Sequence, residues 1–446
     1  MLYGMIVSVA IQFLILPYVL PGIHAGNGLL AGGDFPGLHD IAARMAAKIQ
    51  REGWLKWELL PEGQSSAGLA SIVYALIYPS PWSLIPVNAA SHALGGVAIM
   101  ALVVSVSGNV TLAFIGALLC ISFPSSFQWV SQIQKDSYYI TGMLAILLGL
   151  ITLLRYTRRE SEGSALWAGL FLLAIGVLFA GTARLYALQF IWFAGTLAVL
   201  ASLPSFICAC AAGRISRPKS ITAFVLVAAF LVAAKFGPND SRISGGIPAD
   251  QVDASTLRSE SASGNLAART AADIWKRTRV LPLVIDNQFY RLSTARLGWM
   301  GQSYASAGSM IDNDVRFSSV MQMLLYLPRA LQIGFLAPFP VHWVGEGATP
   351  GGSMMRRITG LEMIILYPLL LVGLPLAAWR WRKRSEFWAV LVFCTSFILI
   401  YSYAIPNLGS LYRMRYGFLM TLAAIGFAAL CLSLQDIKKS WGNSNL

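Results

Sequence analysis

Long apolar stretches alternate with short polar segments along most of the chain. A helix needs about 20 consecutive apolar residues to cross a hydrocarbon core about 30 Å thick, and ten stretches approach that length. They cover residues 5–24, 88–107, 109–124, 137–155, 164–182, 186–207, 220–236, 361–379, 386–404 and 416–434. The pattern predicts an all-α polytopic membrane protein with about ten transmembrane helices.

Two longer segments, residues 25–87 and 237–360, interrupt this pattern. In the first, Gly68 to Tyr78 is too short to span and is predicted to be a re-entrant or interfacial helix, and Ile41 to Glu52 is predicted to be helical. The second begins polar and Ser-rich and then becomes amphipathic, with tryptophans among basic residues, which suits helices lying on a membrane surface. The expected modules are an N-terminal transmembrane module with the first loop (1–236), an amphipathic segment (237–360) and C-terminal transmembrane helices (361–446).

The composition favours the same interpretation. Of the 446 residues, 56% are hydrophobic and 12% are charged, whereas a soluble domain carries roughly 25% charged residues. The net charge of +13 is compatible with nucleic-acid binding, but the placement of the basic residues is not. Many lie in four short segments: Arg155, Arg158, Arg159, Arg214, Arg217, Lys219, Arg380, Arg382, Lys383, Arg384, Lys438 and Lys439. Because Lys and Arg accumulate in short cytoplasmic loops, these charges indicate topology, and no nucleic-acid partner is expected.

Orientation follows from the same residues. With ten spans, all four basic segments fall on one side, which predicts a multi-pass protein of the bacterial inner (cytoplasmic) membrane with both termini cytoplasmic. The two long segments then face the periplasm. No Lys or Arg precedes Arg44, and a signal peptide has a positively charged start, so residues 5–24 are expected to be a retained helix.

Cysteines and histidines give no sign of a metal or disulfide site. The five Cys residues lie in or at the ends of apolar stretches, and no pair of His residues has zinc-ligand spacing. The sequence has no Walker loop and no dinucleotide fingerprint, which argues against nucleotide-driven transport. No required cofactor is predicted, and the use of a divalent metal stays open.

Two acidic positions near the outer ends of predicted spans are candidates for chemistry, since an ionisable residue at membrane depth is a functional candidate by default. Asp34 is followed by Phe-Pro and not by a predicted helix, so we interpret it as functional. Asp40 is interpreted as the N-cap of the helical stretch that follows it. Asp136 lies beside Lys135; it either receives a substrate proton while the lysine meets a phosphate, or stabilises the start of the next helix.

Three arginines stand apart from the basic loops. Arg184 lies alone between the fifth and sixth predicted spans, where it either binds substrate or extends toward the lipid headgroups. Arg413 and Arg415 precede the last span on the predicted outer side, where the positive-inside bias does not explain them, and they suit a phosphate or diphosphate. Asn407 and Gly409 are expected to form the turn that aims them.

The order of these features resembles the GT-C superfamily of integral membrane glycosyltransferases. The matching elements are the first helix, an outer loop with an acidic residue and surface helices, a short helix that ends in Phe-Pro, the pattern Trp-x-x-x-x-x-Lys-Asp ending at Asp136, and the lone Arg184. The similarity covers roughly residues 1–200 and is greatest to the branch with the protein O-mannosyltransferases and the lipid A aminoarabinose transferase. In the C-terminal half, Tyr-Leu-Pro-Arg ending at Arg329 and the segment 412–415 look like elements of bacterial relatives in polysaccharide loci.

The resemblance implies transfer of a sugar from a polyprenyl-phosphate or diphosphate carrier to a glycan, lipid or protein acceptor on the periplasmic side. It implies Asp34 or Asp136 as the general base. Asp34 stands in Gly-Gly-Asp-Phe-Pro, not in the Asp-Glu pair common in the mannosyltransferases, which leaves the acceptor and any metal open. Residues expected to bind the donor phosphate are Lys135, Arg184, Arg413 and Arg415. Further substrate contacts are expected from His39, Asp40, Tyr139, Asn407 and Tyr412.

Two alternatives remain. One is a polysaccharide polymerase or ligase of the same architecture that uses a diphosphate-linked oligosaccharide, for which Arg413 and Arg415 would suit the larger anionic head. The other is a lipid or solute transporter. Transporters favour inverted repeats and helices interrupted at the midplane, and the sequence shows neither, while its unexplained charges lie toward the outer face.

Overall fold

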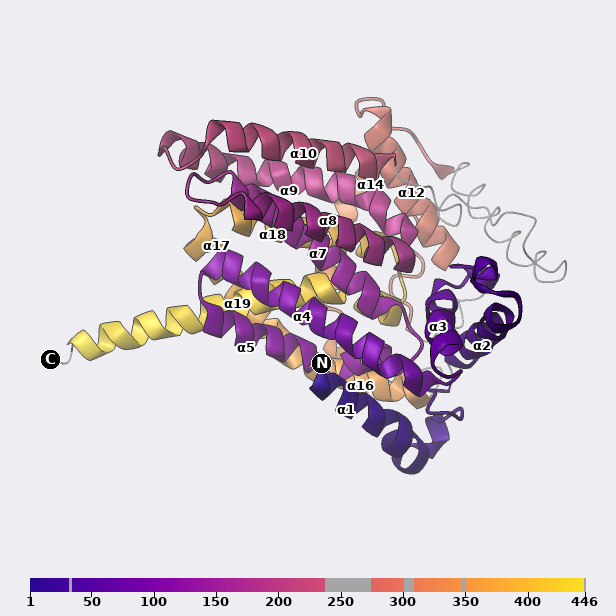
Figure 1. Ribbon diagram of the computed structural model, residues 1–446. Helices are drawn as coiled ribbons and strands as arrows, with labels where there is room; N and C mark the ends of the chain where they lie inside the picture. The colour runs from indigo at the N-terminus through magenta and orange to yellow at the C-terminus, as the bar shows by residue number, and fades with distance from the viewer. Residues whose placement is uncertain (32–33, 237–273, 301–308, 346–349, 445–446) are drawn as a thin grey trace. The chain divides into compact units, whose positions relative to one another are not determined.

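The computed structural model describes residues 1–31, 34–236, 274–300, 309–345 and 350–444 (Figure 1). Within these ranges the regular structure is helical, and the extended pairings are isolated bridges. The α-helices are α1 (Leu2–Ala10), α2 (Phe35–Glu52), α3 (Ser65–Leu76), α4 (Ile85–Ser107), α5 (Val110–Ile121), α6 (Phe127–Ser131), α7 (Asp136–Tyr156), α8 (Ser164–Ala183), α9 (Leu185–Ala211), α10 (Arg217–Lys235), α12 (Leu283–Trp299), α14 (Val320–Leu336), α15 (Pro340–Trp343), α16 (Pro350–Pro368), α17 (Leu374–Trp381), α18 (Ser385–Ala404) and α19 (Leu408–Ser444). The predicted all-α fold is confirmed.

Nine helices of the described part are long and apolar enough to cross a membrane. They are Leu2–Val19, Pro81–Ser107, Asp136–Tyr156, Ser164–Ala183, Leu185–Ala211, Arg217–Lys235, Gly351–Trp381, Ser385–Ala404 and Leu408–Ser440. A tenth apolar stretch is bent by 59° between Val110–Ile121 and Pro124–Ser131, at the Phe-Pro pair that the sequence places there. Each of the ten predicted spans therefore has a helical counterpart, and the polytopic architecture is confirmed.

Some boundaries differ from the predictions for local reasons. The second span begins at Pro81 with a 3-10 turn rather than at residue 88, because proline is favoured in the first turn of a helix. The last helix begins at Leu408, eight residues before the predicted start at 416. There the backbone N–H of Ser410 donates to Asn407 Oδ1 over 3.0 Å. Asn407 therefore caps the last helix, and Gly409 lies inside that helix. The predicted turn at these two residues is wrong.

The chain forms two compact units. Unit 1 comprises Met1–Gly237, Leu361–Ser396 and Tyr416–Leu446, and unit 2 comprises Pro238–Gly360 and Phe397–Arg415. In the predicted amphipathic segment, the Ser-rich part (241–264) lies outside the described residues. The described residues of this segment include α12, α14, α15 and the first turns of α16.

Within unit 1, α7 and α8 pack closely side by side (Figure 1). A Cβ atom on Gly142 would lie 2.4 Å from the backbone nitrogen of Ala180, and one on Gly176 would lie 2.8 Å from the carbonyl oxygen of Gly142. Glycine at these two positions permits the close approach, as small residues do in membrane helix pairs. Since a short loop joins the two helices, the start of α7 lies beside the end of α8.

The basic segments gather at the opposite end of α7. Arg158 forms an ion pair with Glu386, and Ser216 N donates to Thr157 O over 2.9 Å. Arg384 donates to the Val106 carbonyl. The 21 residues of α7 make this helix about 30 Å long, so Asp136 and the basic segments are separated by roughly the thickness of a hydrocarbon core.

Candidate active site

Asp136 and Arg184 form a buried ion pair in unit 1. Arg184 Nη2 lies 2.7 Å from Asp136 Oδ1, and the two side chains are 8% (Arg184) and 2% (Asp136) exposed. Asp136 is the first residue of α7, and Arg184 is the non-helical residue between α8 and α9, with φ −148° and ψ 83°. The packing of α7 on α8 thus joins two residues that the sequence singled out separately.

Two tyrosines hold the Arg184 guanidinium. Arg184 Nη1 donates to the Tyr186 hydroxyl over 3.0 Å, and the guanidinium carbon lies 5.4 Å from the centre of the Tyr139 ring. A cation over an aromatic face is attracted to the ring. Arg184 is therefore buried and fixed in orientation, and the alternative that it extends toward the lipid headgroups is wrong. The substrate contact predicted for Tyr139 stays a prediction.

A second cation lies one residue before the pair. Lys135 Nζ donates to Ser65 Oγ over 3.0 Å, and Ser65 Oγ donates to the Ala183 carbonyl over 3.1 Å. The start of α3 is therefore tied to the end of α8 beside Arg184. Lys135, Asp136 and Arg184, which we call the charged cluster, carry two positive charges and one negative charge. The N-terminus of α7 adds the positive end of a helix dipole, so the cluster has a net attraction for anions.

The first loop departs from the sequence predictions. α2 begins at Phe35 and not after Asp40, so Asp34 directly precedes the helix and Asp40 lies inside it. The interpretation of Asp40 as an N-cap is wrong, and so is the prediction that no helix follows Asp34. The reason is Pro36, which starts this helix instead of breaking the chain. The Asp34 side chain is exposed and makes no capping hydrogen bond.

His39 and Asp40, adjacent residues of α2, differ in their surroundings: His39 contacts α3, and Asp40 is exposed to solvent. His39 Nδ1 shares a hydrogen bond of 2.9 Å with the hydroxyl of Tyr74, a fully buried residue of α3. Burial lowers the pKa of His39 below its ordinary value, which keeps the ring neutral at pH 7. Asp40 is exposed. The His39–Tyr74 contact joins α2 to α3, and the substrate contacts predicted for both residues stay predictions.

The irregular segment before Lys135 is fixed to the first loop. Gln132 Nε2 donates to the Gly28 carbonyl and Gln132 Oε1 accepts from Leu30 N, each over 3.0 Å. Ile133 is buried in the same apolar cluster as Phe35. These contacts hold the loop that carries Asp34 against the segment that leads into the charged cluster. Sequence reasoning missed Gln132, whose only signal was a polar residue beside an apolar helix.

The arginines before the last span do not form an open pair. Arg415 is 1% exposed, its Nη1 donates to the Ile333 carbonyl over 2.7 Å, and its guanidinium also meets the carbonyls of Gly334 and Ala337. It therefore satisfies carbonyl groups at the C-terminus of α14 in unit 2. Arg413 is partly exposed and Tyr412 is buried. The phosphate role of both arginines and the substrate role of Tyr412 and Asn407 stay predictions.

Unit 2 contains an ionic group that the sequence analysis did not identify. Arg329 Nε and Nη2 each lie 2.9 Å from a carboxylate oxygen of Asp312, which also accepts from the Tyr326 hydroxyl over 2.7 Å. The hydrogen bonds from Arg329 hold the pKa of Asp312 below its usual value. Asp312 adopts φ +49°. This bidentate pair fixes the loop before α14.

Glu362 of α16 was also missed. It is 3% exposed, and its Oε1 accepts from the Ser125 backbone N–H over 2.7 Å, at the break of the bent helix pair in unit 1. The sequence did carry a signal, because Glu362 is an acidic residue within the predicted span 361–379.

Among the residues that the structure describes, no group of three His, Cys, Asp or Glu side chains is arranged to hold a metal ion. The five cysteines are free thiols. Whether the activity needs a divalent metal stays a prediction.

No known family matches the sequence, and no curated protein matches it. One solved structure is similar: the archaeal oligosaccharyltransferase AglB from Archaeoglobus fulgidus, in complex with an inhibitory peptide and a dolichol-phosphate. The sequence identity is 14% and the TM-score is 0.49, over 100% of this chain and 51% of that chain. The chain thus spans about half the length of this similar protein.

Proposed function

We propose that the chain is an integral membrane glycosyltransferase that transfers a sugar from a polyprenyl-phosphate-linked donor to a glycan, lipid or protein acceptor. The reaction would take place at the membrane face opposite the basic segments. The observation that carries the proposal is the charged cluster of Lys135, Asp136 and Arg184. Burying charges is costly, and ionisable residues at the ends of membrane helices are functional candidates.

The charged cluster suits a leaving phosphate. In the proposed step, the acceptor oxygen attacks the anomeric carbon with inversion, and the bond from that carbon to the carrier phosphate breaks. The phosphate departs with the electron pair, so negative charge grows on its oxygen. Two fixed cations beside a helix N-terminus favour that charge. Because Tyr139 and Tyr186 already orient Arg184, little reorganisation is needed when the charge develops.

Of the two carboxylates, we propose Asp34 as the general base. Its side chain is exposed and makes no capping hydrogen bond, so it is available to accept the proton of an acceptor hydroxyl. Asp136 Oδ1 instead accepts a hydrogen bond from Arg184. In this proposal Asp136 is a positioning residue that keeps Arg184 in place. Gln132 ties the Asp34 loop to the segment before Lys135 and supports the two parts acting together.

The test is a transfer assay with the purified full chain in proteoliposomes. Radiolabelled polyprenyl-phosphate sugars and, in parallel, diphosphate-linked oligosaccharides are supplied with glycan, lipid and peptide acceptors. The proposal expects label on an acceptor from a monophosphate donor. Label that appears only from the diphosphate donor would favour the polymerase or ligase. Label that crosses the bilayer without joining any acceptor would contradict the proposal and favour a transporter.

A further inference from the structure

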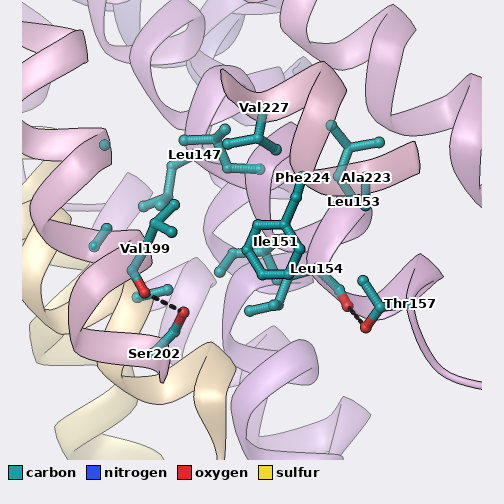
Figure 2. A pocket seen from close by; sticks show the side chains of 14 residues that line it. Leu147, Ile151, Leu153, Leu154, Thr157, Val199, Ser202, Ala223, Phe224 and Val227 are labelled. Carbon is teal, nitrogen blue, oxygen red and sulfur yellow. Dashed lines mark hydrogen bonds between the residues drawn. The ribbon is translucent and has the colours of Figure 1, made fainter. Parts of the chain in front are cut away.

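A cavity lies at the other end of unit 1, away from the charged cluster (Figure 2). Its walls come from α7, α9 and α10, with Ala389 of α18 at one side. The space between the lining side chains is about 510 Å³, counting its open side. The small side chains of Ala198 and Ser202 on α9 leave this room where larger side chains would have filled it.

The lining is apolar. Its hydroxyl groups are those of Thr157 and Ser202, and each donates to a carbonyl of its own helix over 2.7 Å, as the dashed lines in Figure 2 show. Neither hydroxyl therefore has a free proton to donate to a ligand. An apolar cavity of this kind does not hold ordered water. Its natural occupant is therefore a hydrocarbon chain.

The depth of the cavity and the charges around its mouth indicate which hydrocarbon chain it would hold. Along α7 the lining runs from Leu147 to Thr157, which is about 15 Å, or half of a hydrocarbon core. The Thr157 end meets the basic segments, because Ser216 N donates to Thr157 O. Arg214 and Arg217 flank this end, and both side chains are exposed.

The other charges around this end leave it positive. Glu386 is paired with Arg158, and Lys219 donates to the carbonyls of Arg159 and Ser161. This end of unit 1 therefore carries six basic and three acidic residues. The basic residues are Arg155, Arg158, Arg159, Arg214, Arg217 and Lys219, and the acidic residues are Glu160, Glu162 and Glu386. A phosphate at the mouth would therefore be attracted, and it would sit at headgroup depth while its chain lies in the cavity.

We infer that this cavity binds one acyl chain of an anionic phospholipid in the leaflet next to the basic segments. The headgroup phosphate would be held by Arg214 and Arg217. The mouth of this site lies about the length of α7 from the charged cluster, so it is distinct from the proposed donor site.

The test uses the full chain in nanodiscs of phosphatidylcholine that contain a trace of phosphatidylglycerol with a photoactivatable group at the end of one acyl chain. After illumination, labelled peptides are mapped by mass spectrometry. We expect label on the cavity-facing residues of α7 and α9. An equal trace of photoactivatable phosphatidylcholine should label them far less.

Two variants fill the cavity, Ala198→Phe and the milder Ala223→Leu, and Leu200→Phe adds the same ring to an exposed position of α9. Labelling should fall to background in the first two and persist in the third. Only a filled variant that elutes as folded protein is interpreted. If Ala198→Phe does not fold, Ala223→Leu provides the test. Unchanged labelling in a folded, filled variant would overturn the inference.

The headgroup contact is tested by Arg214→Gln with Arg217→Gln, matched in charge by Lys438→Gln with Lys439→Gln at exposed positions of α19. The preference for phosphatidylglycerol should fall about fivefold for each arginine removed, and the matched control should keep it. Equal labelling by phosphatidylcholine in the wild type would contradict the inference. So would displacement of the probe by polyprenyl phosphate but not by unlabelled phosphatidylglycerol, which would assign the cavity to the carrier lipid.

Discussion

The ion pair between Asp136 and Arg184 allows a quantitative test of how the site is built. Asp136→Asn keeps the shape of the side chain and removes its charge. Both partners are less than a tenth exposed, so water screens the pair weakly. Removing one partner of a buried pair typically costs 3–5 kcal/mol, because the other charge stays buried without compensation. Since Tyr139 and Tyr186 still contact Arg184, we expect the lower end, about 3 kcal/mol.

A double-mutant cycle isolates the pair itself. Arg184→Gln removes the charge that Asp136→Asn leaves behind, so the double variant should be less destabilised than the sum of the two single variants. We expect a coupling free energy of about 2 kcal/mol, measured from the free energy of unfolding in detergent micelles. Independent sites show coupling free energies of up to about 0.5 kcal/mol. A measured coupling below that limit would show that Asp136 and Arg184 do not stabilise each other and would refute the prediction.

An exposed pair provides the control. Lys48 and Glu58 are 3.0 Å apart, with side chains 36% and 55% exposed. Glu58→Gln should change the free energy of unfolding by less than about 1 kcal/mol, because solvent screens such pairs.

Three further predictions concern the parts that support the site. Gly28→Ala should destabilise the chain by about 1–3 kcal/mol in thermal unfolding, because Gly28 has φ +73° and its added Cβ would lie 2.7 Å from Gln12 Cβ; Gly37→Ala, in α2 with open space around it, is the control. Arg415→Met should leave carbonyls at the end of α14 unsatisfied and cost about 2–3 kcal/mol; limited proteolysis should then cut near this end, and wild-type resistance would contradict the capping role. Asp312 contributes to the free energy of unfolding above its unfolded pKa of about 4, and this contribution is lost as the pH falls through its lowered folded pKa. Asp312→Asn should remove that loss of stability in acid. A dependence of the free energy of unfolding on pH that is the same in the variant and the wild type would contradict the role of Asp312.

The hydrophobic pattern was sufficient to predict that the helices exist but not to predict the residues at which they begin and end. Each predicted span corresponds to a helix because twenty apolar residues in a membrane protein have few other structures available. The start of α2 at Phe35 was mispredicted because proline both ends and begins helices, and the local sequence does not separate the two uses. The start of α19 was mispredicted because Arg413 and Arg415 made the segment look exposed, although Arg415 is buried.

The site was predictable residue by residue but not as an arrangement. Lys135, Asp136 and Arg184 stand out because charge is rare in an apolar chain. Their mutual contact depends on the packing of α7 against α8, which joins positions 48 residues apart. Ser65, which anchors Lys135, has no local signal at all, since serine is common at the start of a helix, where α3 begins. Tertiary contacts of this kind require the folded backbone.

The central claim is that Asp34 removes a proton from the acceptor while the charged cluster receives the carrier phosphate. Its most direct measurement is the rate of sugar transfer from a polyprenyl-phosphate donor by Asp34→Asn in proteoliposomes, beside the wild type and Glu58→Gln. Loss of a general base lowers a rate by about 10²- to 10⁴-fold, so Asp34→Asn should lose at least about 100-fold while Glu58→Gln keeps the wild-type rate. Transfer by folded Asp34→Asn at the wild-type rate would contradict the account.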